Sequence, residues 1–254
     1  MSETLLEVKG LKKNFGDFQA VKGIDLTVAA GDVLGFLGPN GAGKSTTMRM
    51  ITGFIPATEG DAFICGKSIT TDPIAAKRCL GYLPESAPSY RAMRVKDFLR
   101  FVAQIRGFSG AALEERVAAT IKEAMLTAVE NQTIEMLSKG YRQRTCFAQA
   151  ILHDPKILIM DEPTDGLDPN QKDVVRKWIN NMAAKGKAII ISTHILEEVN
   201  AVCTRAIIIA DGEKKDEGKI VREDGKPDSA VFQGTHETGK IDEVFRKLTK
   251  KEER

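Results

Sequence analysis

The chain has 254 residues, 42% of them hydrophobic, which is enough to bury one large α/β core with or without a small subdomain. Its 37 Lys and Arg residues nearly balance 35 Asp and Glu residues, and the net charge of +2 argues against binding to nucleic acid through bulk charge. The apolar runs are shorter than the roughly 20 residues of a transmembrane helix, so we expect any membrane role to come through a partner.

The cysteines and the N-terminus favour a cytoplasmic protein. The four cysteines are far apart and lack the spacing of metal ligands, which predicts reduced thiols and no disulfide framework. They are Cys65, Cys79, Cys146 and Cys203. The first residues have no signal-peptide pattern.

The first third of the chain predicts strands with two short helices. Two strands, over 5–15 and 19–28, are expected to form a hairpin at Gly16 and Asp17. A buried strand over 33–37 follows, and a helix after it is expected to end near Gly53. The remaining elements expected here are a strand over 60–65, a helix over 73–78 and a strand over 79–83.

Residues 94–154 have the pattern of a helical insertion. Phe98, Phe101, Val102 and Ile105 are spaced as one face of a helix, and a second stripe starts at Leu113. We therefore predict a helical subdomain inserted into an α/β chain.

Three apolar runs, at 157–160, 188–192 and 206–210, lack the alternation of a half-exposed strand. Such runs are typical of strands buried on both faces in a parallel sheet. Between the first two runs, Asp168 is the expected N-cap of a helix with Pro169 at its first position. The predicted fold is α/β, with a mostly parallel core sheet and an antiparallel β subdomain at the N-terminus.

Charge and glycine content increase after Asp211, which predicts a hairpin and then a loose connector through residue 228. An apolar stripe from Ile241 to Leu248 predicts a short terminal helix. We accordingly divide the chain into a main domain over 1–220 and a C-terminal extension over 221–254.

A phosphate-binding P-loop follows the strand over 33–37. The motif consists of Gly38, Pro39, Asn40, Gly41, Ala42, Gly43, Lys44, Ser45 and Thr46. Glycines let the backbone N–H groups turn inward around a phosphate, and the helix that follows adds the positive end of its dipole. Lys44 is expected to reach the β and γ phosphates and Ser45 to hold Mg²⁺. The alternative is a glycine-rich turn with no ligand.

The apolar run over 157–160 ends in two carboxylates, Asp161 and Glu162, which is the Walker B arrangement. Asp161 is expected to hold Mg²⁺ and Glu162 to polarise the attacking water. The alternative is an acidic turn at a strand end.

The segment from Leu137 to Arg144 resembles the signature of the ATP-binding subunits of ABC transporters, which reads Leu-Ser-Gly-Gly-Gln. Further matches to that family are a D-loop over 165–168, a switch histidine at His194 and a Q-loop ending at Glu85. Phe15 resembles the aromatic residue that stacks on adenine. The resemblance covers roughly residues 5–220.

The resemblance implies ATP and Mg²⁺ as ligands and a head-to-tail dimer that encloses two ATP molecules. Each ATP would lie between one chain's P-loop and the signature of a second copy or a close homologue, through Ser138, Lys139, Gly140 and Tyr141. Glu162 would act as general base, His194 would contact the γ-phosphate, and Lys44 would offset charge in the transition state. Ser45, Asp161 and Glu85 are the implied metal ligands.

The sequence departs from the family pattern at three positions. Lys139 replaces a glycine and Tyr141 a glutamine of the signature, and the Q-loop residue is the carboxylate Glu85. These variants resemble the ABC-2 type exporter subgroup, as does the segment over 242–249.

The function implied is the ATP-hydrolysing motor of an exporter, bound on the inner face of the membrane through a separately encoded permease. One alternative is a soluble ABC ATPase that acts on ribosomes or DNA; another is a nucleotide-gated regulator. We expect no nucleic-acid partner. The cargo and the choice between homodimer and heterodimer remain open from the sequence.

Overall fold

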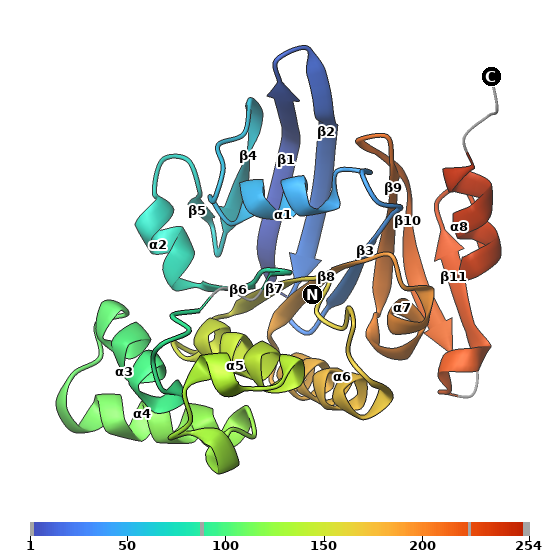
Figure 1. Cartoon of the computed structure of the whole chain (residues 1–254). Coiled ribbons are helices and arrows are strands. Elements are labelled where there is room, and N and C mark those ends of the chain that lie inside the picture. The colour runs from blue at the N-terminus through green and yellow to red at the C-terminus, as the bar shows by residue number, and fades with distance from the viewer. Residues whose placement is uncertain (1–2, 87–88, 223–224, 251–254) are drawn as a thin grey trace.

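The computed structural model describes residues 3–86, 89–222 and 225–250. The smaller of its two sheets is antiparallel and has the order β2-β1-β4-β5 (Figure 1). Its strands are β1 (Thr4–Phe15), β2 (Phe18–Ala29), β4 (Glu59–Ile64) and β5 (Lys67–Ser68). The predicted N-terminal hairpin is confirmed, and Phe15 pairs directly with Phe18 across its turn.

The larger sheet has eight strands in the order β12-β11-β10-β9-β3-β8-β7-β6. Strands β9, β3, β8, β7 and β6 run parallel to one another, and β10 to β12 add an antiparallel edge next to β9. The parallel strands are β3 (Val33–Leu37), β6 (Leu80–Leu83), β7 (Ile157–Asp161), β8 (Ala188–Thr193) and β9 (Arg205–Ala210). The predicted α/β class, with a mostly parallel core sheet, is confirmed.

The central strands are buried on both faces, which explains their continuous apolar sequences. In β7, Ile157 and Ile159 pack toward the smaller sheet, and Leu158 and Met160 pack into the cluster on the other face. Helix α1 (Lys44–Ile51) contacts strands of both sheets and lies between them (Figure 1). It begins at Lys44, so the P-loop residues Lys44 to Thr46 belong to its first turn.

The opposite face of the large sheet is covered by helices. The predicted helical insertion contains α3 (Val95–Ile105), α4 (Gly110–Glu123) and α5 (Lys139–Ile151), which form one apolar cluster with the sheet. Helices α6 (Pro169–Ala184) and α7 (Leu196–Val202) belong to the same cluster, whereas α2 (Pro73–Arg78) packs on the side of the smaller sheet. Asp168 caps α6, accepting a hydrogen bond from the Gln171 N–H at 3.0 Å, with Pro169 at the first position as predicted.

The C-terminal part differs from the expected loose connector. After β10 (Glu213–Arg222), a 3₁₀ turn leads into β11 (Ala230–Gly234) and β12 (Thr238–Lys240), which extend the large sheet. The sequence analysis predicted no strand between the connector and the terminal helix and so missed β11 and β12, and the boundary expected at residue 220 falls inside β10. Helix α8 (Ile241–Thr249) is present as predicted, with Ile241 and Val244 buried.

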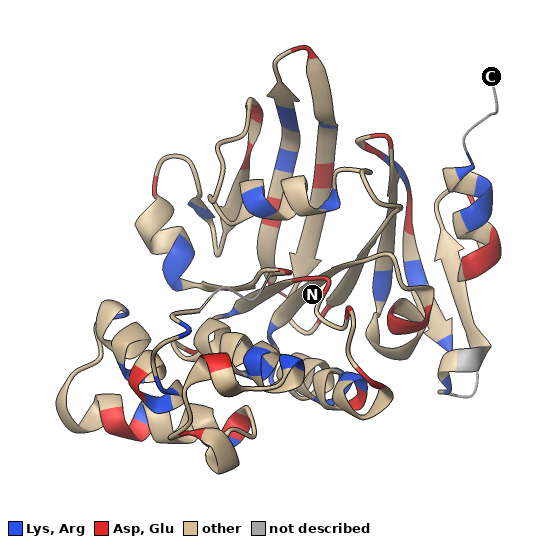
Figure 2. Cartoon of the chain, in the orientation of Figure 1, with Lys and Arg blue, Asp and Glu red and all other residues tan. Residues whose placement is uncertain are grey.

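Basic and acidic residues are interspersed over the strands and helices, in line with the small net charge (Figure 2). Among the described residues, no helix combines the length and the apolar character that crossing a bilayer requires.

Candidate nucleotide site

The site lies where three parallel strands end together. Strand β3 pairs with β8 and β8 with β7, and the register places Leu37 opposite Thr193 and Asp161 opposite Ser192. The residues that follow these strand ends are the P-loop, Glu162 and His194. Three segments far apart in the sequence therefore meet at one edge of the sheet, the usual place for a ligand in an open α/β sheet.

The P-loop glycines are needed for their backbone conformation and for close approach. Gly41 and Gly43 have φ values of 81° and 99°, in the left-handed region that most residues avoid. A Cβ atom on Gly43 would lie 2.8 Å from the Ala20 carbonyl oxygen, and one on Gly38 would lie 2.6 Å from that of Ile209. Only glycine fits at these two positions without displacing backbone.

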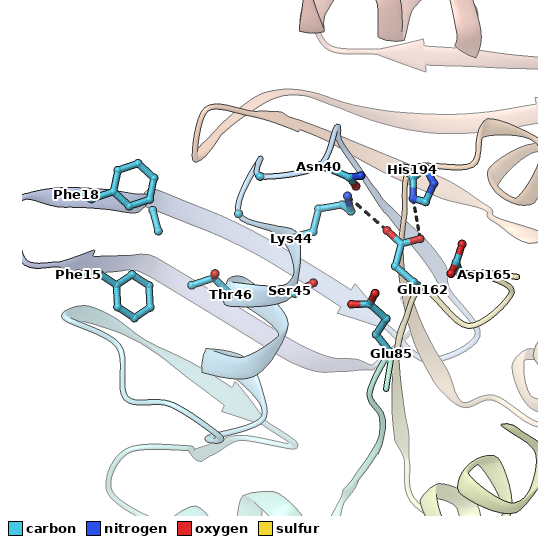
Figure 3. Close-up of a pocket in the computed structure, with 13 residues that line it drawn as sticks. Phe15, Phe18, Asn40, Lys44, Ser45, Thr46, Glu85, Glu162, Asp165 and His194 are labelled. Carbon is cyan, nitrogen blue, oxygen red and sulfur yellow. Dashed lines mark hydrogen bonds and ion pairs between the residues drawn. The ribbon is translucent and has the colours of Figure 1, made fainter. Parts of the chain in front are cut away.

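A cleft of about 550 Å³ opens in front of the loop (Figure 3). It is lined by Phe15, Phe18, Ala20, Asn40, Gly41, Gly43, Lys44, Ser45, Thr46, Glu85, Glu162, Asp165 and His194. Gly38, Pro39 and Ala42 do not line it; Ala42 is buried, and the other two present carbonyl groups to Lys44. The structure thus brings most P-loop residues to one cavity with the predicted residues Glu162, Glu85, His194 and Phe15, whereas Asp161 is buried and does not line it.

At the closed end of the cleft, charged side chains contact one another. The Lys44 Nζ atom lies 3.4 Å from Glu162 Oε1, and both side chains are buried, with 6% and 9% exposure. The other carboxylate oxygen of Glu162, Oε2, lies 3.0 Å from Nδ1 of His194. The residues predicted as general base and switch histidine are therefore in hydrogen-bond contact.

The oxygen atoms near Asp161 fit the requirements of Mg²⁺. Ser45 Oγ donates to Asp161 Oδ1 at 3.2 Å, and the hydroxyl of Ser192 donates to the same oxygen. The described residues contain no group of three or more His, Cys, Asp or Glu side chains that could enclose a metal. Since Mg²⁺ is commonly held by one or two carboxylates together with phosphate oxygens and water, this incomplete set suits a metal that arrives with its nucleotide. Glu85 lines the same cleft.

Tyr82, three residues before Glu85, is a neutral neighbour of Asp161. Burial, followed by the negative charge of Asp161, raises the pKa of Tyr82 to about 12. The phenol therefore keeps its proton at neutral pH and adds no negative charge beside Asp161.

Two exposed phenylalanine rings occupy the other end of the cleft. Phe15 and Phe18 are 52% and 67% exposed, and Figure 3 places both rings at the end away from Glu162. Sequence reasoning identified Phe15 but missed Phe18. Residues directly opposite in a hairpin carry their side chains on the same face, so the spacing of the two rings around a two-residue turn was the available signal. Asp165 was recognised only as part of the D-loop, although it also lines the cleft.

The signature residues lie outside this cleft. Ser138 caps α5 by accepting from the Tyr141 N–H at 3.4 Å, and Gly140 is close enough to the Gln171 side chain that a Cβ would clash with it. Lys139 lies with its amine against Gly166 of the D-loop. Ser138, Lys139, Gly140 and Tyr141 are absent from the cleft lining, so one chain does not bring them to its own P-loop.

Comparisons with known proteins agree with these features. The family model described as ABC transporter matches residues 21–165. The Nod factor export ATP-binding protein I of Cupriavidus pinatubonensis is 36% identical over 215 residues, which cover 85% of this chain and 66% of that protein. The probable multidrug ABC transporter ATP-binding protein YbhF of Escherichia coli is 33% identical over 91% of this chain, a match that spans only 41% of YbhF.

Solved structures give the same result for the fold. An ATP-binding subunit of an ABC transporter superposes with a TM-score of 0.82 at 30% identity, covering 97% of this chain and all of that one. A dimeric cassette in a post-hydrolysis state, bound to ADP and Pi, has a TM-score of 0.77 at 24% identity over 85% of this chain and 98% of that one. At that identity, the second likeness concerns the fold alone.

Proposed function

The chain belongs to the ABC transporter family of ATP-binding ATPases, and from that premise we propose that it is the ATP-hydrolysing subunit of an exporter. The observation that carries hydrolysis is the contact of Glu162 with both Lys44 and His194 in a cleft lined by the P-loop. A turn that merely contained glycines would need neither a buried cation nor a carboxylate at the same strand edge.

In the proposed reaction, the N–H groups of the loop and the N-terminus of α1 bind the phosphates, and Lys44 stabilises the charge that develops on the γ-phosphoryl group. Glu162 accepts a proton from the attacking water, and His194 orients that water and contacts the γ-phosphate. Ser45, Asp161 and Glu85 would hold Mg²⁺, which would supply positive charge to the phosphates. Phe15 stacks on the adenine.

We further propose that the signature acts on a nucleotide bound by another chain. The N-terminus of α5, with the hydroxyl of Ser138, provides N–H groups and a positive dipole end to an anion. Because these residues do not line the cleft of their own chain, a head-to-tail dimer is the arrangement that uses them. A bacterial ABC transporter cassette of this fold has been solved as a dimer, which supports a dimeric state for this chain.

The proposed membrane partner and the proposed direction of transport are based on the names of the matched relatives. One matched protein is named for Nod factor export, and YbhF is named as a probable multidrug ABC transporter protein. We propose that this chain likewise works with a separately encoded transmembrane permease and binds it at the inner face of the membrane. The cargo would then be selected mainly by the permease.

Mixing two inactive variants tests the shared site. Lys44→Ala disables the P-loop, and Ser138→Arg blocks the signature, so each variant alone should hydrolyse little ATP. If sites are shared between chains, a mixed dimer contains one intact site, and mixing should restore hydrolysis. Continued inactivity of mixtures that form dimers would contradict the trans arrangement.

Ser109→Arg is the matched control for the added charge, because Ser109 precedes α4 and makes no side-chain cap bond. This variant should hydrolyse ATP like the wild type. Co-purification of the wild type with a multi-span membrane protein encoded beside it would test the proposed permease, and recovery with ribosomes or DNA would contradict it.

A further inference from the structure

We propose that Cys65 and Cys79 form an oxidation site: a peroxide converts the two thiols into an intramolecular disulfide, and a dithiol reductant opens it again. The bond joins the smaller sheet to the start of β6 in the larger sheet. This inference is independent of the proposed function, because neither cysteine lines the nucleotide cleft.

The two thiols are in contact although they belong to different elements. Cys65 follows β4, and Cys79 follows α2 and precedes β6. The S–H group of Cys65 donates a hydrogen bond to the Cys79 sulfur, and both side chains pack against the same apolar cluster. Helix α2 contacts β4, β5 and β6 and so brings its C-terminal end beside the turn between β4 and β5 (Figure 1). Two sulfur atoms in hydrogen-bond contact need only a small displacement to reach bonding distance.

Backbone hydrogen bonds fix each cysteine to a different sheet. The Cys65 N–H donates to the carbonyl of Leu5 in β1 at 2.7 Å. The Cys79 carbonyl accepts a hydrogen bond from the N–H of Ile157, the first residue of β7, at 3.0 Å. A disulfide at this position therefore links the two sheets through backbone that is already held in place.

Exposure separates this pair from the other two cysteines. Cys65 and Cys79 are partly exposed, whereas Cys146 and Cys203 are buried. Burial also raises the pKa of Cys146 and of Cys203 to about 12, so both thiols keep their protons at neutral pH. Since thiolate character and access to solvent control oxidation, a small oxidant in water should react first at the pair.

The hydrogen bond gives the two sulfur atoms different roles. Burial, followed by the hydrogen bond to Cys79, raises the pKa of the Cys65 thiol to about 12. Cys65 therefore keeps its proton at neutral pH, and its S–H group stabilises a thiolate on Cys79. Because the thiolate is the nucleophile, Cys79 is the sulfur that attacks the peroxide.

The reaction balances with the peroxide as the oxidant. The Cys79 thiolate attacks one peroxide oxygen, an S–O bond forms, the O–O bond breaks, and hydroxide leaves. The Cys65 sulfur then attacks the sulfenic acid on Cys79, and the S–S bond forms as the hydroxyl group leaves with the Cys65 proton as water. Each sulfur loses one electron, and the peroxide gains both.

Tryptic mapping of the full-length protein tests the proposal without any substitution. The protein is treated with hydrogen peroxide, and its remaining thiols are blocked before digestion. Trypsin leaves the two cysteines on separate peptides, over 50–67 and 79–91. We expect these peptides to be joined with the loss of two hydrogen atoms and to separate after dithiothreitol. Absence of this cross-link, or pairing of either cysteine with Cys146 or Cys203 instead, would overturn the proposal.

Serine variants test the roles of the two sulfur atoms. Cys65→Ser keeps a hydrogen-bond donor beside Cys79, so the sulfenic acid on Cys79 should persist and react with dimedone. In Cys79→Ser, dimedone labelling of Cys65 should be about tenfold slower or less than that, because Cys65 keeps its proton. Equal labelling of the two variants would overturn the assignment of Cys79 as the attacking sulfur. Cys203→Ala is the matched control and should form the cross-link at the wild-type rate; loss of the cross-link in this variant would overturn the pairing.

Urea unfolding measures whether the cross-link fits the native backbone. A disulfide that closes a loop of about 15 residues stabilises a protein mainly by restricting the unfolded chain. The oxidised wild type should therefore have a higher urea midpoint than the reduced protein, and Cys65→Ser treated in the same way should show no such rise. An unchanged or lower midpoint after oxidation of the wild type would mean that the native backbone is distorted by the bond, and would overturn the proposal.

Discussion

Substituting Gly43 by alanine tests whether backbone conformation and close contact require glycine at this position of the P-loop. Gly43 has φ of 99°, and an added Cβ would lie 2.8 Å from the Ala20 carbonyl oxygen, a backbone atom that cannot rotate away. A left-handed conformation costs an L-residue about 1–2 kcal/mol. The crowding adds about 1–3 kcal/mol, and the lower entropy of the unfolded alanine chain returns about 0.4–1 kcal/mol. We therefore expect Gly43→Ala to lower the free energy of unfolding by about 2–4 kcal/mol.

Gly41→Ala is the matched control in the same loop. Gly41 also has a positive φ, of 81°, but an added Cβ would meet nothing within 4 Å. This variant carries the conformational cost alone, about 1 kcal/mol. Urea unfolding of the two variants at equal protein concentration separates the two effects. Equal destabilisation by both substitutions would refute the argument from contact with Ala20.

The other predictions concern stacking on adenine, the C-terminal strands and one buried histidine. Phe15→Ala should raise KM for ATP about tenfold, because stacking on a nucleotide base contributes about 1–3 kcal/mol. Phe54→Ala removes a 73% exposed ring outside the cleft lining and should leave KM unchanged. An equal rise of KM in the two variants would exclude stacking of Phe15 on adenine. Asp216→Ala should lower the free energy of unfolding, measured in urea, by about 3 kcal/mol without changing ATP affinity, because the buried carboxylate accepts backbone N–H bonds from residues 217 and 235–237. A variant as stable as the wild type would contradict this. Burial lowers the pKa of His153 to about 4, so the unfolded state, with a pKa near 6.5, binds more protons between these values. The free energy of unfolding should therefore decrease by about 2–3 kcal/mol as pH falls from 6.5 to 4. In His153→Gln, the free energy of unfolding should depend less steeply on pH, and an equally steep dependence in the two proteins would contradict this.

The core strands and the main motifs could be predicted because their signals are local. Fully buried strands such as β7 and β8 need continuous apolar sequence, and a P-loop needs glycines at fixed spacing. The cap of α6 at Asp168 is equally local. Each of these features depends on residues close together in the chain, so one sequence is enough to recognise it.

The features that the sequence did not predict depend on contacts between distant segments of the chain. Strands β11 and β12 are short and contain polar residues and glycine, and their turn is held by Asp216, about 20 residues earlier. Sequence reasoning therefore predicted no strands in this region. The pairing of Lys44 with Glu162 likewise joins residues more than a hundred positions apart, and only the register of β3, β8 and β7 brings them together.

The most direct test of the account compares ATP hydrolysis by the wild type and by Glu162→Gln, with Mg²⁺ present and ATP binding measured in parallel. We expect the variant to retain ATP binding and to lose hydrolysis by about 10²-fold or more, because loss of a positioned general base costs about 10²–10⁴-fold. Hydrolysis at the wild-type rate by Glu162→Gln would contradict the assignment of Glu162 as the base and, with it, the proposed mechanism.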